Sequence, residues 1–554
     1  MSRAAMRQAM QNTRLNLLDR AIAAVSPRAG LQRYRDRLQW NVAMALSGAY
    51  TGASRSKRQF GDWKTTGGDA DADTLFDLPL LRERARDLNR NNPLAAGAIH
   101  TKVGNVVGTG LALKSAIDAD FLGLTEDQAE EWQRTTEREF NFWAESQDAD
   151  VARTLNFYQQ QELAFRSTLE NGDAFALPVY VERTGSVYSL AVQLIEADRV
   201  CNERFMADSE RIAGGVERDT SGAPVRYHIL DQHPGAIRVN RAAATWTKVP
   251  AFNRSGRRNV LHLYRQLRIG QSRGVPDLAP VVSALKQLGD YTEAELTAAV
   301  VSGLFTVFIQ ANDPEGVFAS KAAEALDAGN PYVVGEQSIK MGAGNVVALA
   351  PGEEINAPNP GRPNTAFDPF VQAILRQVGS ALELPFELLV MHFSASYSAS
   401  RAALLQAWKF FKARRFWLAD NFCQPIYEAF MWEAVALGRI AAPGFLQDPI
   451  VRAAWLGSEW VGDAPGAIDP MKEAQAAGFM EDRGWKTGAE NTAELTGGDW
   501  ESKHRRLTRE RRMRREAGLD KESVSERIRT EPTDPTPPGD DPAGDPNKSD
   551  NMAA

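Results

Sequence analysis

The 554-residue sequence has little of what metal and thiol chemistry require. Its only two cysteines, Cys201 and Cys423, exclude a disulfide framework and a cysteine-based zinc site, and they fit a reducing compartment. None of its six histidines shows the His-Glu-x-x-His spacing of a zinc enzyme. His228 and His233 lie near each other around an expected turn, where a structural role is more common than metal ligation. We therefore expect no metal and no cofactor.

The sequence also lacks a long hydrophobic run. Its longest apolar stretch, "LTAAVVSGLFTVFIQ" (296–310), is interrupted by Ser302, Gly303 and Thr306 and is too short to span a bilayer. The N-terminus is basic and helix-like, but it has no continuous apolar segment of the kind found in a signal peptide. These absences predict a soluble intracellular product with no membrane partner.

Catalytic and nucleotide-binding motifs are absent or out of context. No G-x-x-x-x-G-K-[ST] occurs, and "KVGNVVGTG" (102–110) follows an expected helix where a dinucleotide fingerprint follows a strand. "DADAD" (69–73) fails as a calcium loop and is interpreted as a polar linker. The penicillin-binding triplets at 283–286, 486–488 and 549–551 stand in the wrong order, with the first inside a long expected helix. We expect no enzymatic activity.

Charge is present but unevenly distributed. The formal net charge is −7, yet residues 1–58 hold eleven Lys or Arg against Asp19 and Asp36. Residues 503–515 hold eight Lys or Arg against Glu510 alone. Basic ends suit nucleic acid or an acidic partner, and they equally suit solvated tails that keep a protein soluble. Both interpretations stay open.

The first half of the chain indicates an α+β body. Helical periodicity begins near residue 80, breaks at Asn91-Asn92-Pro93 and resumes, and amphipathic helices are expected near 126–147 and 156–171. Strand-rich segments with Gly, Asp and Pro turns then continue to about residue 275.

The second half has a different order of elements. A helix over 278–305 with Pro280 at its start leads into short strands and Gly/Pro-rich turns up to 364, and a second helix covers 367–382. A Ser/Ala-rich stretch then precedes a helix over 400–438, which Pro425 is expected to kink.

The basic residues of this long helix form no clean stripe. Leu405 and Trp408 share the arc of Arg401, Lys409 and Lys412. A mostly buried helix whose cations pair with acidic neighbours is therefore favoured over a DNA-facing stripe.

Three separated segments carry a family resemblance. They are "RARDLNRNNPLAAGAI…NVVGTGL" (84–111), "ALELPFELL" (381–389) and "SASYSASRAALLQAW" (394–408). In this order, with the helix–strand–helix arrangement between them, they resemble the portal proteins of lambda-like tailed bacteriophages. The resemblance covers roughly residues 35 to 500.

The resemblance implies an α+β portal-type fold in a ring, usually of twelve subunits, at one capsid vertex. The implied parts follow the chain in order: a basic N-terminal arm and linker (1–75), an α/β wing (76–277), stem helix 1 (278–305), a small β clip (306–364), stem helix 2 (365–390), a tunnel loop (391–399), a long kinked helix (400–438), a crown (439–500) and a basic, then compositionally disordered, tail (501–554).

A ring of this kind would form a channel for packaging and ejecting DNA. Twelve helices side by side enclose a lumen of about 28 Å, wide enough for a duplex. Small neutral Ser and Ala groups would touch passing double-stranded DNA without gripping its phosphates. The implied channel residues are His392, Ser394, Ser396, Tyr397, Ser398, Ser400 and Arg401.

The clip would make the outward contacts. The implied partners are the terminase large subunit and later a neck or adaptor protein, besides the major capsid and scaffold proteins around the ring. The implied clip residues are Gly342, Gly344, Asn345, Pro351, Glu353, Glu354, Pro358 and Arg362. Two alternatives remain: a nucleic-acid-processing enzyme, which would need clustered acidic ligands or a P-loop, and a scaffold or adaptor without a channel.

Overall fold

The computed structural model describes residues 17–46, 62–63, 65, 67–237, 244–303, 308–311, 353–356, 366–393, 396–464, 470–496 and 500–517. The chain divides into two units, Met1–Asp73 and Thr74–Ala554. In the first unit, α2 (Leu17–Val25) packs against α3 (Pro27–Leu46). The helices approach closely at Gly30, where a Cβ would lie 2.6 Å from the Cβ of Ala23.

The expected helix break at Asn92 is confirmed. Helix α5 (Leu78–Asn91) ends there and α6 (Pro93–Val106) begins, with the Asn92 carboxamide accepting from the backbone N–H groups of Leu94 and Ala95. Pro93 occupies the first helical position, where its missing N–H costs nothing. The segment 69–73, interpreted as a polar linker, ends at the boundary of the two units, and Ala70–Thr74 form the short helix α4 there, with the backbone N–H of Ala72 donating to the Asp69 carboxylate.

The expected amphipathic helices are also present. They are α8 (Glu126–Ala144) and α9 (Phe157–Asn171), and each begins with a capping box, at Thr125 and Asn156. Short helical turns connect the elements of this region: α7 (Ala119–Leu122), Gln147–Ala149, Ala197–Arg199 and Glu203–Phe205.

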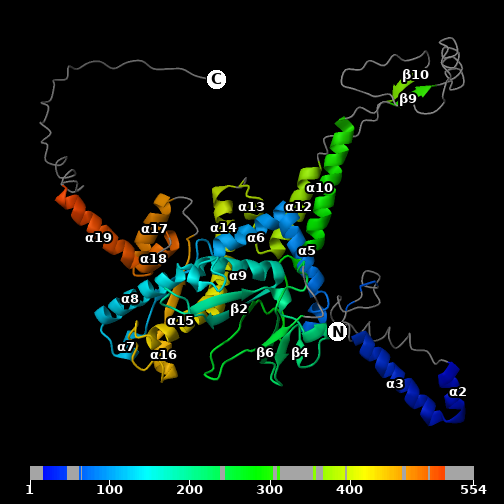
Figure 1. The fold of residues 1–554 in the computed structure, drawn as a ribbon. Helices are drawn as coiled ribbons and strands as arrows, with labels where there is room; N and C mark the ends of the chain where they lie inside the picture. Colours follow the sequence, from blue (N-terminus) through cyan, green and yellow to red (C-terminus); the bar gives the residue numbers. More distant parts are fainter. Residues whose placement is uncertain are drawn as a thin grey trace, which may run out of the picture. The chain divides into compact units, whose positions relative to one another are not determined.

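Two antiparallel sheets complete the body (Figure 1). The first sheet has the strand order β3-β2-β8 and consists of β2 (Asp173–Tyr180), β3 (Leu190–Ile195) and β8 (Leu261–Tyr264). The second sheet has the strand order β4-β5-β6-β7 and consists of β4 (Ile212–Ala213), β5 (Val216–Arg218), β6 (Pro224–Leu230) and β7 (Trp246–Pro250). All these strands lie within the segment that was expected to be strand-rich up to about residue 275, and the side chains of β7 are all exposed or half-buried. Mixed helices and sheets confirm the α+β class.

Residues from distant parts of the chain build the main core. Strand β1 (Ala112–Ser115) pairs antiparallel with β11 (Ser458–Val461), and α16 (Pro449–Trp455) lies just before β11. The buried rings of Phe140, Phe157 and Phe430 meet at centroid distances of 5.2 and 5.8 Å from Phe140. Aromatic rings at such distances stabilise a core beyond their burial alone.

The segment expected to form a helix, strands and a second helix does so where it is described. A 3-10 turn (Ala279–Val281) leads into α10 (Val282–Gly303), β9 (Phe308–Ala311) pairs antiparallel with β10 (Glu353–Asn356), and α12 (Phe367–Ala381) follows. Helix α13 (Phe386–Leu389) is a single turn. Among the described residues, no helix is long and apolar enough to cross a membrane.

The long helix begins and bends differently from the expectation. Helix α14 (Tyr397–Leu418) starts at Tyr397 where Ser400 was expected, and it continues through a π-helical turn (Ala419–Cys423) into α15 (Gln424–Ala436). The irregularity thus precedes Pro425, which lacks an N–H to continue the α-helical pattern. The remaining helices are α17 (Pro470–Asp482), α18 (Gly488–Leu495) and α19 (Trp500–Glu516).

Candidate nucleic-acid interface

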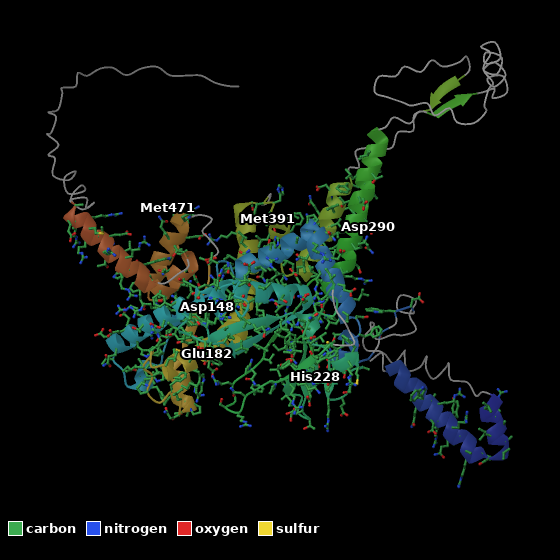
Figure 2. All side chains as sticks on the ribbon, in the orientation of Figure 1. Asp148, Glu182, His228, Asp290, Met391 and Met471 are labelled. Carbon is green, nitrogen blue, oxygen red and sulfur yellow. The ribbon has the colours of Figure 1, made fainter. Side chains whose placement is uncertain are left out.

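The loop between α13 and α14 exposes neutral and apolar side chains. Pro385 precedes the single turn of α13, and the backbone N–H of His392 donates to the carbonyl of Glu387, which closes the turn. Met391 has a φ of 52°, a left-handed conformation that is unusual for a non-glycine residue. Met391 and Phe393 are 70% and 52% exposed, and Figure 2 labels Met391 at this end of α13. Apolar rings and thioethers left open in one chain indicate a surface that another molecule covers.

The predicted channel residues divide between this loop and the first turns of α14. His392 and Ser396 lie in the loop and are exposed, whereas Ser398, Ser400 and Arg401 lie on the helix. The hydroxyls of Ser396 and Ser398 are 3.4 Å apart, so the structure brings these two together. Ser394 and the Tyr397 side chain lie outside the described residues.

Two of the predicted residues do not join the exposed group. Ser400 is 9% exposed and faces the protein. Arg401 donates to Glu473 of α17 at 2.5 Å, so its charge is already paired. The exposed part of the candidate site is therefore uncharged.

Three further cations of α14 are also engaged, whereas Lys409 is exposed. Lys412 pairs with Glu494 at 3.4 Å, and Arg414 lies 3.3 Å from Asp277. The Arg415 guanidinium donates to the carbonyls of Asn105, Val106 and Asp463. Burial lowers the pKa of Arg415 from its usual value, while nearby Asp463 partly opposes this shift. The expected acidic partners are present for Arg401, Lys412 and Arg414, but the expectation of a mostly buried helix is wrong, because most described side chains of α14 are exposed or half-buried.

The geometry does not support acyl transfer by the penicillin-binding triplet at 283–286. Ser283 lies in the first turn of α10, contrary to the expectation of a mid-helix position. Lys286, however, is an exposed side chain that forms an i,i+4 ion pair with Asp290. The hydrogen bond and charge of Asp290 raise the pKa of Lys286, which is opposite to what a general base requires.

The two helices α10 and α12 lie against each other. Tyr291 of α10 stacks on Phe367 at 5.6 Å and meets Phe370 edge-on at 5.3 Å. Beyond this contact, Leu296 and Val300 of α10 are 66% and 59% exposed. The helix pair therefore has an internal seam and an uncovered apolar face.

Only part of the predicted clip is described. Glu353 and Glu354 lie on β10 opposite Ala311 and Gln310 of β9. The other predicted clip residues lie outside the described residues: Gly342, Gly344, Asn345, Pro351, Pro358 and Arg362.

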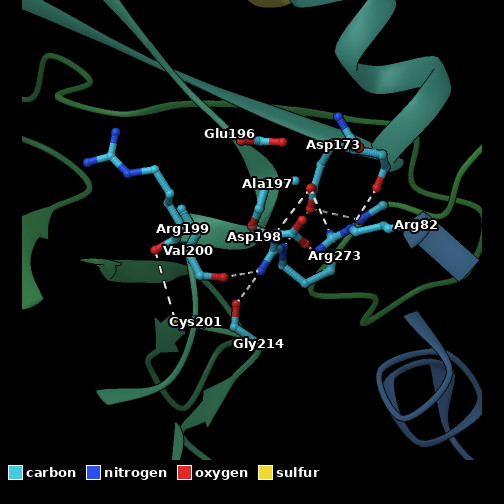
Figure 3. Close-up of polar contacts among 12 residues, drawn as sticks. Arg82, Asp173, Glu196, Ala197, Asp198, Arg199, Val200, Cys201, Gly214 and Arg273 are labelled. Atoms are coloured by element: carbon cyan, nitrogen blue, oxygen red, sulfur yellow. Dashed lines mark hydrogen bonds and ion pairs between the residues drawn. The ribbon is translucent and has the colours of Figure 1, made fainter. Parts of the chain in front are cut away.

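A buried ion network, which the sequence did not indicate, fixes the sheet β3-β2-β8 (Figure 3). Asp173, with no exposed surface in its side chain, accepts from Arg82 at 2.9 Å and from Arg273 at 2.5 and 3.1 Å. Arg273 also donates to the carbonyls of Ala197, Val200 and Gly214. Burial alone would raise the pKa of Asp173, but the two guanidiniums overcome it and hold this pKa well below its usual range.

Asp198 extends this network toward the surface. It pairs with Arg82 at 3.2 Å and with Arg86 at 2.5 Å. Glu196, Asp198 and His233 form a group with metal-ligand chemistry among the described residues. Because two arginines already neutralise Asp198, this group is explained as part of the ion network.

A cavity of about 890 Å³ lies beside α14. Trp408, Phe416 and Ala419 line one side, and residues of β11 and α18 line the other, including Trp460 and Ala493. Phe416 is 75% exposed. The cavity is a second uncovered apolar surface, and it lies beside α14, the helix that follows the candidate loop.

Helices on either side of the antiparallel pair β9–β10 in the sequence, a loop of small side chains and exposed apolar faces are typical of a structural protein. The model of the lambda family of phage portal proteins matches residues 56–415, and the chain belongs to this family. The family consists of portal proteins, which are structural components of the phage particle.

Individual relatives agree with this assignment. The portal protein of Escherichia phage N15 is 25% identical over 493 residues, covering 85% of this chain and 91% of its own length. Portal protein B of Escherichia phage lambda is 25% identical over 492 residues, with the same coverage of 85% and 91%. A solved structure of the neck of a native gene transfer agent particle is 12% identical, with a TM-score of 0.38, covering 75% of this chain and 94% of that one.

Proposed function

We propose that this portal protein assembles into a ring, with twelve subunits, whose centre is a channel for double-stranded DNA at one capsid vertex. The observation that carries the proposal is the pair α10 and α12, which flank the β9–β10 hairpin in the sequence and contact each other through Tyr291, Phe367 and Phe370. In the ring these two helices are the stem and the hairpin is the base of the clip.

The exposed faces support a ring over a solitary subunit. Leu296 and Val300 of α10 and Phe370 of α12 are at least half exposed. Covering one such side chain stabilises an assembly by about 1.5 to 3 kcal/mol, and side-by-side packing of identical stems covers the same residues in every subunit. We assign residues 76–277 to the wing and 439–500 to the crown on the same grounds of chain order.

The loop residues suit contact with a sliding duplex. Exposed Ser396 and Ser398 offer small hydroxyls, and the neighbouring Arg401 is held by Glu473. Sequence-independent attraction to DNA comes from cations that replace counterions at phosphates. A loop that offers hydroxyls, and whose neighbouring Arg401 is paired, would let the duplex move.

The partners follow from the same arrangement. The clip would dock the terminase large subunit during packaging and a neck or adaptor protein afterwards, through turns in 306–364 that a single hairpin cannot cover. The wing and crown would face the major capsid and scaffold proteins.

The test is to change the charge of the loop. Replacing Ser396 and Ser398 by Lys adds two cations per subunit, which should bind phosphates and slow DNA passage. Replacing both by Asp should repel the duplex, and less strongly at high salt, since the field reaches only about 8 Å at physiological ionic strength. DNA packaged and retained per assembled particle should fall at least tenfold in both variants.

The matched control places the same charges elsewhere. Ser221 and Ser255 are exposed serines in turns of the wing, and their Lys variants should package normally. Negative-stain images should show rings with a central hole for every variant. Normal packaging by both the Lys and the Asp loop variants would mean that this loop does not meet DNA, and the absence of rings would refute the assembly itself.

A further inference from the structure

The described contacts of helix α19 (Trp500–Glu516) with other elements of its unit lie near its beginning. Glu501 pairs with Lys114 of β1 at 3.0 Å, Lys503 donates to the hydroxyl of Thr496 just after α18, and Arg505 pairs with Glu130 of α8 at 3.1 Å. Each of these contacts involves the first six residues of the helix. The described contacts therefore anchor its beginning and leave the remainder uncovered.

The uncovered part is strongly cationic. Residues 505–516 contain seven Arg and two Glu, and all of them are exposed. Arg506 and Arg512 form only i,i+4 pairs with Glu510 and Glu516, at 3.4 and 3.8 Å. Exposed pairs of this kind are weak and break easily.

Three further arginines on this helix have no such ion pair. Arg509, Arg511 and Arg514 form no ion pair or hydrogen bond within the part of the chain that the structure describes. At 100° per residue Arg511 and Arg514 lie about 60° apart and Arg509 lies on the opposite side, and the other four arginines of 505–515 fill the angles between them. The cationic surface is therefore not a stripe but wraps the whole helix.

The same helix lacks an apolar face. Leu507 and Met513, 51% and 55% exposed, are the apolar side chains of its outer part. Their separation of six positions places them about 120° apart around the axis. A membrane-surface helix needs a continuous apolar side, and a protein interface needs an apolar centre. A ligand that carries only charge fits this surface better than either.

We infer that residues 505–515 of α19 form a second DNA-contact surface, which binds the phosphates of a duplex without reading its sequence. Arginine guanidiniums match phosphate oxygens with two parallel hydrogen bonds. The ten steps from Arg505 to Arg515 span about 15 Å, and a duplex carries one charge per ~1.7 Å of its axis, so several phosphates come within reach of one helix. This surface does not depend on the channel loop.

The experiment measures binding of the purified full-length protein to a fluorescein-labelled 30-base-pair duplex by fluorescence anisotropy. The triple variant R509Q/R511Q/R514Q removes the three unpaired cations and keeps good helix formers. We expect its affinity to fall at least tenfold at 100 mM salt. Its log–log salt slope should become shallower by about 2 to 3, at roughly 0.9 per lost phosphate contact.

A matched control removes three other helical arginines. Arg84 and Arg90 of α5 and Arg134 of α8 are exposed and form no ion pair or hydrogen bond among the described residues, so R84Q/R90Q/R134Q changes the net charge equally. This control should bind within about twofold of the parent, and R509K/R511K/R514K should restore the salt slope. If both Gln triples lose affinity equally, attraction is a property of net charge and the inference is wrong.

An acidic protein segment is the competing ligand. A synthetic peptide with the sequence of residues 530–554, which holds six Asp or Glu and one Lys, is titrated in the same assay. Binding of this peptide through α19 without binding of the duplex would replace the inference with a protein contact. Duplex binding by α19 alongside normal packaging by the charged loop variants would uphold this surface and reject the channel assignment, so the two proposals fail separately.

Discussion

Two sets of arginines in this protein have opposite surroundings. Arg82 and Arg273 are 4% and 2% exposed and share Asp173 inside the wing, whereas Arg509, Arg511 and Arg514 stand exposed on α19. Desolvation makes a buried charge expensive unless its partners are close and well aligned. An exposed charge carries no such cost and stays available to a ligand.

The difference teaches which charges determine the fold and which serve an assembly. All the N–H groups of the Arg273 guanidinium donate hydrogen bonds to Asp173 or to three backbone carbonyls. Arg273 therefore joins β2 to the turns after β3 and β4. Arg509, Arg511 and Arg514 of α19 form no ion pair within the described part of the chain. Removing the first kind should cost stability, and removing the second kind should cost binding.

The largest effect is expected from Asp173→Asn. The variant leaves Arg82 and Arg273 buried with Asp198 as the remaining acidic neighbour, and breaking a buried pair from one side costs about 3–5 kcal/mol. Urea unfolding followed by circular dichroism should show this loss in the free energy of unfolding.

Glu203→Gln provides the control for that variant. It ends the ion pair of Glu203 with Lys248, in which the two side chains are 35% and 47% exposed. The control should lose less than about 1 kcal/mol. Equal losses in the two variants would contradict the contrast between buried and exposed charges.

A smaller loss of stability is expected when the pH is lowered, and His262 is the group responsible. Burial lowers the pKa of His262 to about 4, while its hydrogen bond to Asp173 opposes the shift. A carboxylate only accepts, so Nε2–H of the neutral ring donates to Asp173 at 3.3 Å. Between pH 6.5 and about 4 the unfolded chain therefore binds a proton that the folded chain does not, and stability falls as the pH falls.

The expected loss across that window is roughly 2–3 kcal/mol. His262→Gln keeps a donor for Asp173 but cannot titrate, so its free energy of unfolding should depend less steeply on pH than that of the parent. Unfolding curves at pH 7, 5.5 and 4.5 for both proteins measure the difference. Parallel pH profiles would show that His262 is not the group responsible.

Local signals in the sequence predicted the local parts of this fold. The break at Asn92-Pro93 was predictable because the cap and the proline act on their own neighbours. The seven-residue Ser/Ala run was partly misjudged: α14 begins at Tyr397 because serines are tolerated in the first turn, where backbone N–H groups lack helical partners. Ser396 and Ser398 are exposed, and their contact with DNA stays a prediction.

Contacts between distant segments gave no such signal. Asp173 lies 91 residues from Arg82 and 100 from Arg273, and no spacing rule connects them. The pairing of β1 with β11 joins short strands separated by most of the chain. The basic run at 503–515 was visible in the sequence, but only the structure separates its anchored beginning from its exposed remainder.

The smallest effect, and the sharpest test of the comparison, is the stability of R509Q/R511Q/R514Q. These side chains are exposed and unpaired in the described structure, and Gln differs little from Arg in helix propensity. Removing three like charges from one helix also relieves their mutual repulsion, which offsets any lost packing of the side-chain stems. The free energy of unfolding should therefore stay within about 0.5 kcal/mol of the parent, while affinity for the duplex falls. A loss of 2 kcal/mol or more, roughly that of a buried contact, would mean that these arginines hold the fold and would remove the contrast with Arg82 and Arg273.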